Sequence, residues 1–270
     1  MWIDTHCHLD AGEYQGRSLE VAEQAACAGV SAIVIPAVHP GNFSAVASLA
    51  QQRAQCFYAL GIHPLYVPTT QESAIAELRS EVERLMSLAT GAEKFVAIGE
   101  IGLDFFVPAL CQPPLREKQE FFYMEQLKIA RDFKLPVLLH VRRSQDIILK
   151  HLRRIKVAGG IAHAFNGSEQ QASHFIELNF KLGFGGAMTY SRALQIRRLA
   201  TRLPLESLVL ETDAPDISPS WIHPAINTPA QLPRIGAVLA ELRGLSPAEL
   251  ARQTSLNAQA ILPRMKSLRM

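Results

Sequence analysis

The segment Trp2-Ile3-Asp4-Thr5-His6-Cys7-His8-Leu9 begins as an apolar strand and ends in a pair of histidines. Side chains alternate between the two faces of a strand, so His6 and His8 point the same way and Cys7 points the other way. Two imidazoles on one face, where a strand ends, can both reach a single cation. This His-x-His pair is therefore the first indication of a metal site, and further ligands are expected elsewhere in the chain.

Seven more short runs of apolar and β-branched residues follow this first strand. The predicted strands are Trp2–His6, Ala32–Val38, Cys56–Gly61, Phe95–Glu100, Pro136–Val141, Gly160–Ala164, Lys181–Ala187 and Ser207–Thr212. The segments between them are long enough for helices, and some show apolar residues at helical spacing. This alternation predicts βαβ units and a parallel sheet. Eight such units in 270 residues predict an α/β fold, a closed (β/α)₈ TIM barrel that forms a single domain over residues 1–270.

An open doubly wound sheet is the alternative arrangement for the same pattern of elements. That fold would favour a glycine fingerprint after the first strand, where this chain carries histidines instead. The barrel is therefore the fold that the sequence favours.

Metal-binding residue types recur where later predicted strands end. These potential ligands are Glu100, His140, His163 and Asp213. Imidazole nitrogens and carboxylate oxygens are ligands that Zn²⁺, Mn²⁺ and Mg²⁺ accept. The carboxyl ends of all strands in a (β/α)₈ barrel point to one face, where catalytic groups converge. The four residues are therefore expected to meet the His-x-His pair in one pocket.

The histidines are concentrated at this predicted rim. Six of the nine lie at the carboxyl end of a predicted strand or just beyond it, namely His6, His8, His39, His63, His140 and His163. By contrast, His151 and His174 are predicted to lie on helix surfaces. This distribution favours a functional site at the rim over scattered structural histidines.

Two acidic positions pose a burial problem. Glu100 ends a run too apolar for an exposed strand, and a buried carboxylate must be paired or coordinated because burying it alone costs several kcal/mol. Asp213 follows the apolar run 208–210 and raises the same problem. Glu211 shares the face of Asp213 by alternation, so the residues alone leave open which acid binds a metal. An ion pair between Glu211 and an arginine is the structural alternative.

The composition places weaker bounds on function. Four cysteines at irregular spacings, with no C-x-x-C, are expected to be reduced thiols. The sequence has no run of about 18 apolar residues and no signal-peptide pattern, so we expect a cytoplasmic protein without a membrane segment. A net charge of +2 neither demonstrates nor opposes a polyanionic partner. No obligatory protein partner is evident.

Six motifs, taken together, resemble the TatD family of metal-dependent deoxyribonucleases, and within it the YjjV-like branch. The motifs are Asp4-Thr5-His6-Cys7-His8, Gly61-Ile62-His63-Pro64, Gly99-Glu100-Ile101-Gly102-Leu103-Asp104, Pro136-Val137-Leu138-Leu139-His140-Val141-Arg142, His163-Ala164-Phe165-Asn166-Gly167-Ser168 and Glu211-Thr212-Asp213-Ala214-Pro215. They occur in order between residue 3 and about residue 260. The family belongs to the amidohydrolase-like superfamily, whose members are metal-dependent hydrolases.

The resemblance implies two divalent metal ions, Zn²⁺, Mn²⁺ or Mg²⁺. The first would be held by His6, His8, Glu100 and Asp213, and the second by a bridging Glu100 with His140 and His163. It also implies that His63 and Arg142 face a substrate phosphate and that Glu211 lies behind the ligands. Three departures border the expected substrate site: Val141, Asn166 and Thr228 replace residues common in the family. They bear on specificity rather than on the ligands.

The activity implied is hydrolysis of a phosphodiester, in DNA, by a hydroxide that one or two divalent ions activate. Glu100 would bridge the ions and Asp213 would serve as the general base. Basic residues cluster after the fifth predicted strand and could contact a nucleic-acid backbone: Arg142, Arg143, Lys150, Arg153, Arg154 and Lys156. The alternative, which is the more frequent case for such a helix face, is that these side chains are simply solvated. Aromatic residues near strand ends are available to stack a base: Phe105, Phe106, Phe165 and Tyr190.

Two other functions are compatible with the same donors. One is a metal-dependent amide or ester hydrolase, such as a deacylase, in which the activated water would attack a carbonyl. The other is a non-catalytic binding module with structural metals, although structural sites are usually closed by four protein ligands.

Overall fold

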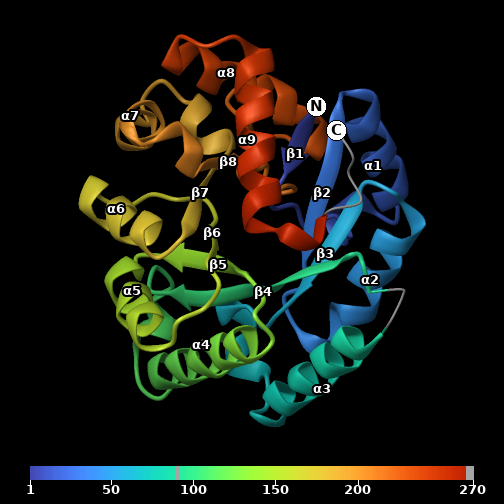
Figure 1. The fold of residues 1–270 in the computed structure, drawn as a ribbon, viewed down its shortest axis with the longest axis vertical. Helices are drawn as coiled ribbons and strands as arrows, with labels where there is room; N and C mark the ends of the chain where they lie inside the picture. The colour runs from blue at the N-terminus through green and yellow to red at the C-terminus, as the bar shows by residue number, and fades with distance from the viewer. Residues whose placement is uncertain (89–91, 266–270) are drawn as a thin grey trace.

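Strands and helices alternate along the chain in the computed structural model, which describes residues 1–88 and 92–265 (Figure 1). The strands are β1 (Trp2–Asp4), β2 (Val30–Pro36), β3 (Cys56–Leu60), β4 (Phe95–Asp104), β5 (Val137–Arg142), β6 (Gly160–Ala162), β7 (Phe180–Phe184) and β8 (Leu208–Leu210). The α-helices are α1 (Ser18–Cys27), α2 (Phe43–Gln52), α3 (Ser73–Ser87), α4 (Leu115–Asp132), α5 (Gln145–Arg154), α6 (Glu169–Glu177), α7 (Leu194–Arg202), α8 (Leu232–Arg243) and α9 (Pro247–Ile261). The predicted (β/α)₈ barrel is confirmed.

The strands form one parallel sheet in sequence order from β1 to β8. The two outer strands meet just beyond their regular ends, where the amide of Thr5 donates to the carbonyl of Leu210 at 3.1 Å. A parallel bridge between Cys7 and Ala214 follows. These contacts close the ring, so the carboxyl ends of all strands face the same side of the molecule.

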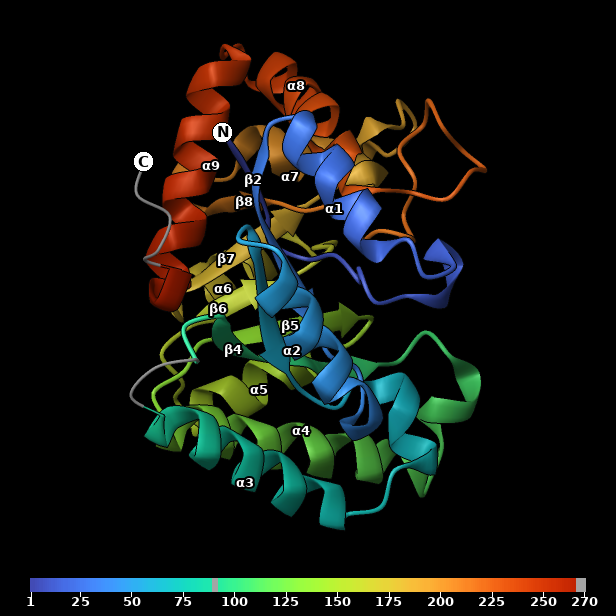
Figure 2. The ribbon, with the colours of Figure 1, turned by 90° about the vertical axis from the view of Figure 1, so that its right-hand side faces the viewer.

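The interior of the barrel is filled by small and branched side chains, and α9 covers its amino-terminal end (Figure 2). The interior cluster comprises Ile3, Ala32, Val34, Phe57, Ala59, Val96, Ala97, Leu138, Ile161 and Val209, together with Ala258, Ile261, Leu262 and Met265 from α9 and the turn after it. A larger apolar cluster lies between the strands and the outer helices. This shared core supports the proposal that residues 1–270 form a single domain.

One strand differs from its prediction in a way that matters for the site. β4 continues to Asp104, beyond its predicted end at Glu100, because Leu103 and Asp104 pair with Val141 and Arg142 of β5. The pairing register of β4 with β5 shifts between Ile98 and Ile101. Glu100 therefore lies at an irregularity within a strand, a feature that often directs a side chain toward an active site.

The prediction that His151 lies on a helix surface is wrong. His151 of α5 is buried, and its Nε2 lies 3.0 Å from the Glu120 carboxylate of α4. This partner on the neighbouring helix satisfies Nε2 and compensates for part of the cost of burying the ring.

Two further expectations concern the whole chain. Cys7, Cys27, Cys56 and Cys111 are all free thiols, as expected. Within residues 1–88 and 92–265, no helix has both the length and the hydrophobicity needed to span a bilayer.

We expect Leu262→Ala to lower the free energy of unfolding by about 2–5 kcal/mol, because Leu262 is fully buried between α9 and the barrel strands. Urea denaturation followed by circular dichroism measures this loss. Leu194→Ala removes the same atoms from a side chain that is 75% exposed and should cost less than about 0.5 kcal/mol. Equal losses in the two variants would contradict the role of α9 as the cover of the barrel.

Candidate active site

A cleft of about 1370 Å³ opens at the carboxyl ends of the strands. Residues that follow or end nearly every strand line it, including His8, His39, His63, Glu100, His140, His163 and Asp213. The folded chain thus brings these predicted rim histidines together around one cleft.

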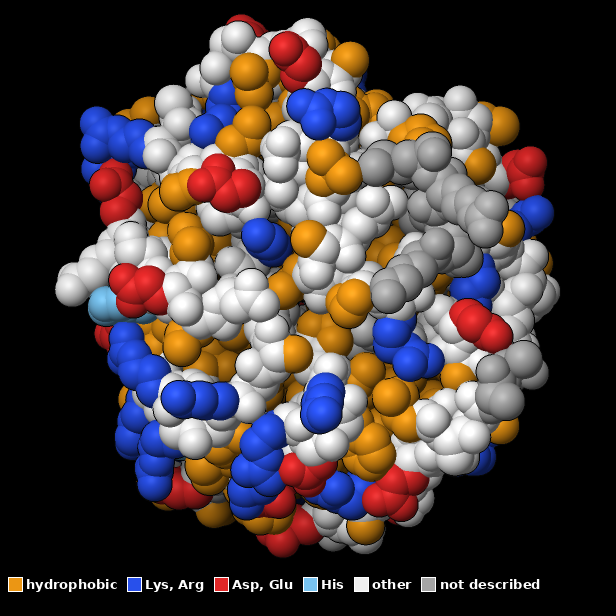
Figure 3. All heavy atoms as spheres, in the orientation of Figure 1, with side chains coloured by type: hydrophobic (Ala, Val, Ile, Leu, Met, Phe, Trp, Pro, Cys, Tyr) orange, Lys and Arg blue, Asp and Glu red, His pale blue; other side chains and the backbone are white. Residues whose placement is uncertain are grey.

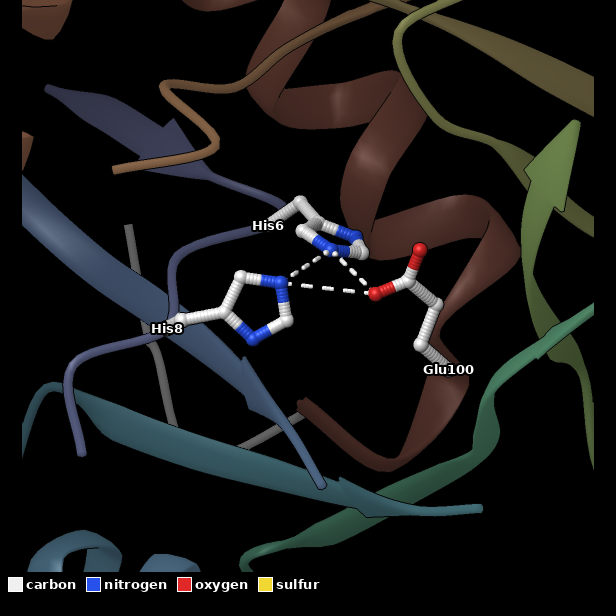
Figure 4. Close-up of side chains that lie close together, drawn as sticks. All are labelled: His6, His8 and Glu100. Atoms are coloured by element: carbon white, nitrogen blue, oxygen red, sulfur yellow. Dashed lines mark hydrogen bonds and ion pairs between the residues drawn. The ribbon is translucent and has the colours of Figure 1, made fainter. Parts of the chain in front are cut away.

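His6, His8 and Glu100 point toward a common centre (Figure 4). The Glu100 Oε2 atom lies 3.1 Å from His6 Nε2 and 3.4 Å from His8 Nε2, and the two ring nitrogens are 3.4 Å apart. Asp213 Oδ1 lies 3.7 Å from His6 Nε2 and 3.6 Å from His8 Nε2. The alternation of β1 thus brings both imidazoles to one point, where two carboxylates join them.

The second oxygen of Glu100 faces a different group of histidines. Its Oε1 atom lies 2.9 Å from His163 Nε2, 3.0 Å from His140 Nδ1 and 3.4 Å from His63 Nε2. In the part of the chain that the structure describes, every ion-pair partner of Glu100 is a histidine. One buried carboxylate therefore stands between two sets of imidazole nitrogens.

Two of the three histidines on the Oε1 side, His140 and His163, have a second carboxylate near their outer ring nitrogen. Asp104 Oδ2 lies 3.1 Å from His140 Nε2, and Glu211 Oε1 lies 3.6 Å from His163 Nδ1. The Asp104 carboxylate favours a proton on the outer nitrogen of His140, which would leave the inner nitrogen with a lone pair for a metal ion. Next to the Glu100 carboxylate, such a nitrogen attracts a cation, either a metal ion or a proton. The donor set therefore fits divalent metal ions.

The charge states agree with this arrangement. Burial lowers the pKa of His6 to about 3, so its ring, stacked 4.0 Å from that of His163, is neutral. Burial would raise the pKa of Glu100, but the surrounding imidazoles, His63 and His163 first among them, hold it well below its usual range. Burial raises the pKa of Asp213 to about 6. Burial opposes a charge on His8, His140 and His163, but the carboxylates around them raise the pKa of all three, that of His8 to about 9. Without a metal ion, the Glu100 carboxylate therefore faces protonated imidazoles as well as neutral ones.

Comparison with known proteins decides the family, because residues 3–263 match the family of TatD related DNases. The chain belongs to the TatD family. Over 257 residues it is 40% identical to the uncharacterized metal-dependent hydrolase YjjV of Escherichia coli (strain K12), covering 95% of each chain. The crystal structure of E. coli YjjV superimposes with a TM-score of 0.90 at 39% identity, covering 97% of this chain and 98% of that one.

A human relative carries a more specific name. The deoxyribonuclease TATDN3 of Homo sapiens is 27% identical over 267 residues, covering 98% of this chain and 96% of that protein. The predicted resemblance to the TatD family is confirmed, and with it the prediction that the chain is an enzyme, a metal-dependent hydrolase.

His63 differs from the other histidines of this TatD site in its proton position. Its Nδ1 accepts a hydrogen bond from the amide of Leu65 at 3.1 Å, so its Nε2 carries the proton. Burial lowers the pKa of His63 to about 4, which keeps the ring neutral. His63 therefore presents an N–H donor to the centre rather than a lone pair.

The structure separates the two acids that alternation left equivalent. Asp213 faces His6 and His8, whereas Glu211 lies behind His163 and accepts a hydrogen bond from the amide of Ala164. Among the described residues, the ion-pair partner of Glu211 is His163 and not an arginine.

Two functional carboxylates received no role from the sequence. Asp104 contacts His140, as described above. The Oδ atoms of Asp4 accept from the amide of His6 at 3.3 Å, the amide of Thr212 at 3.0 Å and the Thr212 hydroxyl at 2.6 Å. Burial raises the pKa of Asp4 to about 8. Both acids lie within apolar strands. An acid in such a strand is expected to be buried and to have a partner, so this pattern could have identified both residues from the sequence.

The predicted basic surface is only partly at the site. Arg142 and Arg143 line the cleft, but α5 runs from the carboxyl end of the barrel toward its amino end. Arg153, Arg154 and Lys156 therefore lie away from the cleft, and Figure 3 shows Lys and Arg side chains gathered over α4 and α5 on that opposite face. The alternative interpretation, a solvated helix face, thus fits Arg153, Arg154 and Lys156.

Of the three departures from the family pattern, Val141 and Asn166 line the cleft. Thr228 is not among the lining residues. Its neighbour Asn227 is buried and donates to the carbonyls of Thr212 and Asp216, so it joins the loops after β8.

We expect Gly183→Ala to destabilise the protein by about 1–3 kcal/mol, because a β-carbon at Gly183 would overlap the carboxylate of Glu211. Thermal unfolding measures the effect. Gly12→Ala, at a position with open space around the added carbon, is the matched control and should change stability by less than about 0.5 kcal/mol. A Gly183→Ala protein as stable as this control would show that Glu211 is free to move.

Proposed function

We propose that this TatD hydrolase cleaves phosphodiester bonds in DNA with two divalent metal ions at Glu100. The observation that carries the proposal is the position of the Glu100 carboxylate, whose oxygens face two separate groups of histidines. The name of the human relative, a deoxyribonuclease, supports the choice of DNA.

The proposed ligands divide between the two oxygens of Glu100. The first ion would be held by His6, His8, Glu100 and Asp213, and the second by Glu100, His140 and His163. Ligands rich in imidazole suit Zn²⁺ or Mn²⁺, and a carboxylate bridge also suits Mg²⁺. Bound at these ligands, the ions would supply positive charge that lowers the pKa of a water molecule and neutralises a phosphoryl oxygen.

The remaining side chains accept the proton of the attacking water and bind the phosphate. Asp213 orients the attacking water and takes its proton as the general base, a role that suits a carboxylate beside His6 and His8. His63 donates a hydrogen bond from its Nε2–H group to a phosphoryl oxygen. Arg142, whose side chain is 49% exposed in the cleft wall, provides a planar pair of donors for the same phosphate.

The alternative of an amide or ester hydrolase on the same metals is not favoured. A neutral carbonyl substrate needs no guanidinium beside the centre, and the family match is to nucleases. A non-catalytic binding module is not retained, because the family is one of enzymes.

We further propose that the protein works in the reducing cytoplasm, a compartment that suits its four free thiols. Its nucleic-acid substrate is the one partner that this function requires.

We expect metal binding to depend on Glu100. The wild type, purified without added metal, should hold about two ions per chain, and Glu100→Gln should lose at least one of them because the bridge is gone. Chelation should abolish hydrolysis. Elemental analysis and activity assays measure both effects, and Glu120→Gln, which alters a carboxylate paired with the buried His151, should retain both ions. A Glu100→Gln protein with full metal content would refute the bridging role.

We expect Arg142→Ala to lower kcat/KM for a phosphodiester by about 10- to 100-fold, because it removes hydrogen bonds to a charged group. The same variant should change hydrolysis of a neutral carboxylic ester by less than about threefold. Arg154→Ala removes an equal charge at the end of α5, away from the cleft, and should affect neither substrate. Equal losses on both substrates would speak for the ester hydrolase.

A further inference from the structure

The cleft is unevenly charged along its wall. Among the described residues that line it, Arg142 and Arg143 are the only lysines or arginines. The acidic lining residues are Asp10, Glu13, Glu100, Glu211, Asp213 and Asp216. A polyanion that enters this cleft therefore meets neutralising side chains only on the rim formed by the loops after β4 and β5.

Both arginines pack on one aromatic ring at this rim. The guanidinium carbon of Arg142 lies 3.8 Å from the centroid of Phe106, and that of Arg143 lies 4.8 Å from it. Cation–π contacts of this kind restrict the guanidinium groups while leaving their N–H donors free. Phe106 is 45% exposed, so the two arginines do not bury its ring completely.

The backbone at Arg143 makes this packing possible. Neighbouring side chains in a strand point to opposite faces, so two consecutive arginines would normally diverge. Arg143 has a φ of 56°, in the left-handed region that residues with a β-carbon rarely adopt. This turn brings both guanidinium groups to the same ring, and strained backbone of this kind clusters at functional sites.

The loop that carries Phe106 is fixed to the proposed metal centre. The Oδ1 atom of the buried Asp104 accepts from the amides of Phe106 at 2.8 Å and Val107 at 3.0 Å. Its Oδ2 atom lies 3.1 Å from His140 Nε2 and 3.8 Å from Arg142 Nη1. The Asp104 carboxylate thus fixes both the loop that carries Phe106 and the proposed metal ligand His140, and this pre-organises the rim.

The other aromatic residues near strand ends are less suited to this role. Phe165 is buried, and the hydroxyl of Tyr190 donates to the carbonyl of Ser218, away from the rim. Phe105 lies under the guanidinium of Arg116.

We propose that Arg143, held by Phe106, forms a second phosphate subsite that binds the phosphate next to the scissile one. This inference rests on the proposed phosphodiesterase function and deepens it. Arg142 and Arg143 lie on the same ring, so the ring fixes the spacing between the two bound phosphates. Arg143 contacts substrate, whereas Phe106 is a positioning residue. The preferred substrates are nucleotide chains with at least two phosphates rather than isolated phosphodiesters.

The test compares thymidine dinucleotides that differ only in a terminal phosphate: none, one at the 5′ end, or one at the 3′ end. The wild type should cleave one of the phosphorylated forms with a kcat/KM about tenfold above that of the unphosphorylated dinucleotide. Arg143→Gln should reduce this ratio to about one. Arg154→Gln, the charge-matched control outside the cleft, should keep the wild-type ratio. Arg143→Gly, which suits a φ of 56°, is the second variant in case the first does not fold.

The positioning role of Phe106 is tested by measuring kcat and KM of its variants separately. Phe106→Leu should raise KM for the phosphorylated dinucleotide about tenfold with little change in kcat, and Phe106→Tyr should restore the wild-type KM because it keeps the ring. A merely structural role would change kcat and KM for all three dinucleotides alike, and that result would overturn the positioning role.

Equilibrium binding separates this inference from the proposed function. A fluorescein-labelled thymidine oligonucleotide should bind Arg143→Gln about tenfold more weakly than the wild type, with a log–log salt slope shallower by about 0.7. Equal binding and equal preference in the two proteins would overturn the subsite, while cleavage of the unphosphorylated dinucleotide would still support the phosphodiesterase. Hydrolysis of neutral esters alone, with no oligonucleotide binding, would overturn both.

Discussion

The burial of one carboxylate, that of Glu100, is the constraint on which the rest of the site depends. An ionised carboxylate in a protein interior costs several kcal/mol unless positive charge or hydrogen bonds compensate for it. The fold provides this compensation by bringing histidines from β1, β3, β5 and β6 around the two oxygens. The irregular register of β4 directs the side chain into that ring of nitrogens, and closure of the barrel between β1 and β8 brings the His-x-His pair to it.

Further carboxylates keep the imidazoles in place. Asp104 holds His140, Glu211 holds His163, and Asp4 ties the backbone of His6 to the end of β8. Each of these acids is buried and contacts a residue of the site rather than solvent. Such partners fix ring orientation and tautomer, which decides which nitrogen offers a lone pair. Gly183 contributes to the same arrangement, because the absence of a side chain there leaves room for the Glu211 carboxylate.

The sequence predicted the barrel and the convergence of its ligands, because both follow from short-range patterns. Apolar runs separated by helical segments imply parallel strands, and alternation places His6 beside His8. It did not predict that β4 continues past Glu100, since that depends on pairing between Leu103 and Val141 of another strand. Strand alternation alone did not separate Asp213 from Glu211, although the family resemblance did. Alternation gives both the same face, and the positive φ of 53° at Asp213, which sets its side chain apart, appears only in the folded chain.

The helix that covers the amino-terminal end of the barrel, α9, also bears on the side from which molecules reach the site. α9 packs against the side chains that fill the barrel interior, and the cleft opens at the carboxyl ends of the strands, so substrate, product and ions would enter there. Under the proposed function, a nucleic-acid chain bound in that mouth would block exchange of whatever lies beneath it. Ions held at Glu100 would then be shielded from competing chelators for as long as the chain remained bound, and departure of the product would reopen the centre.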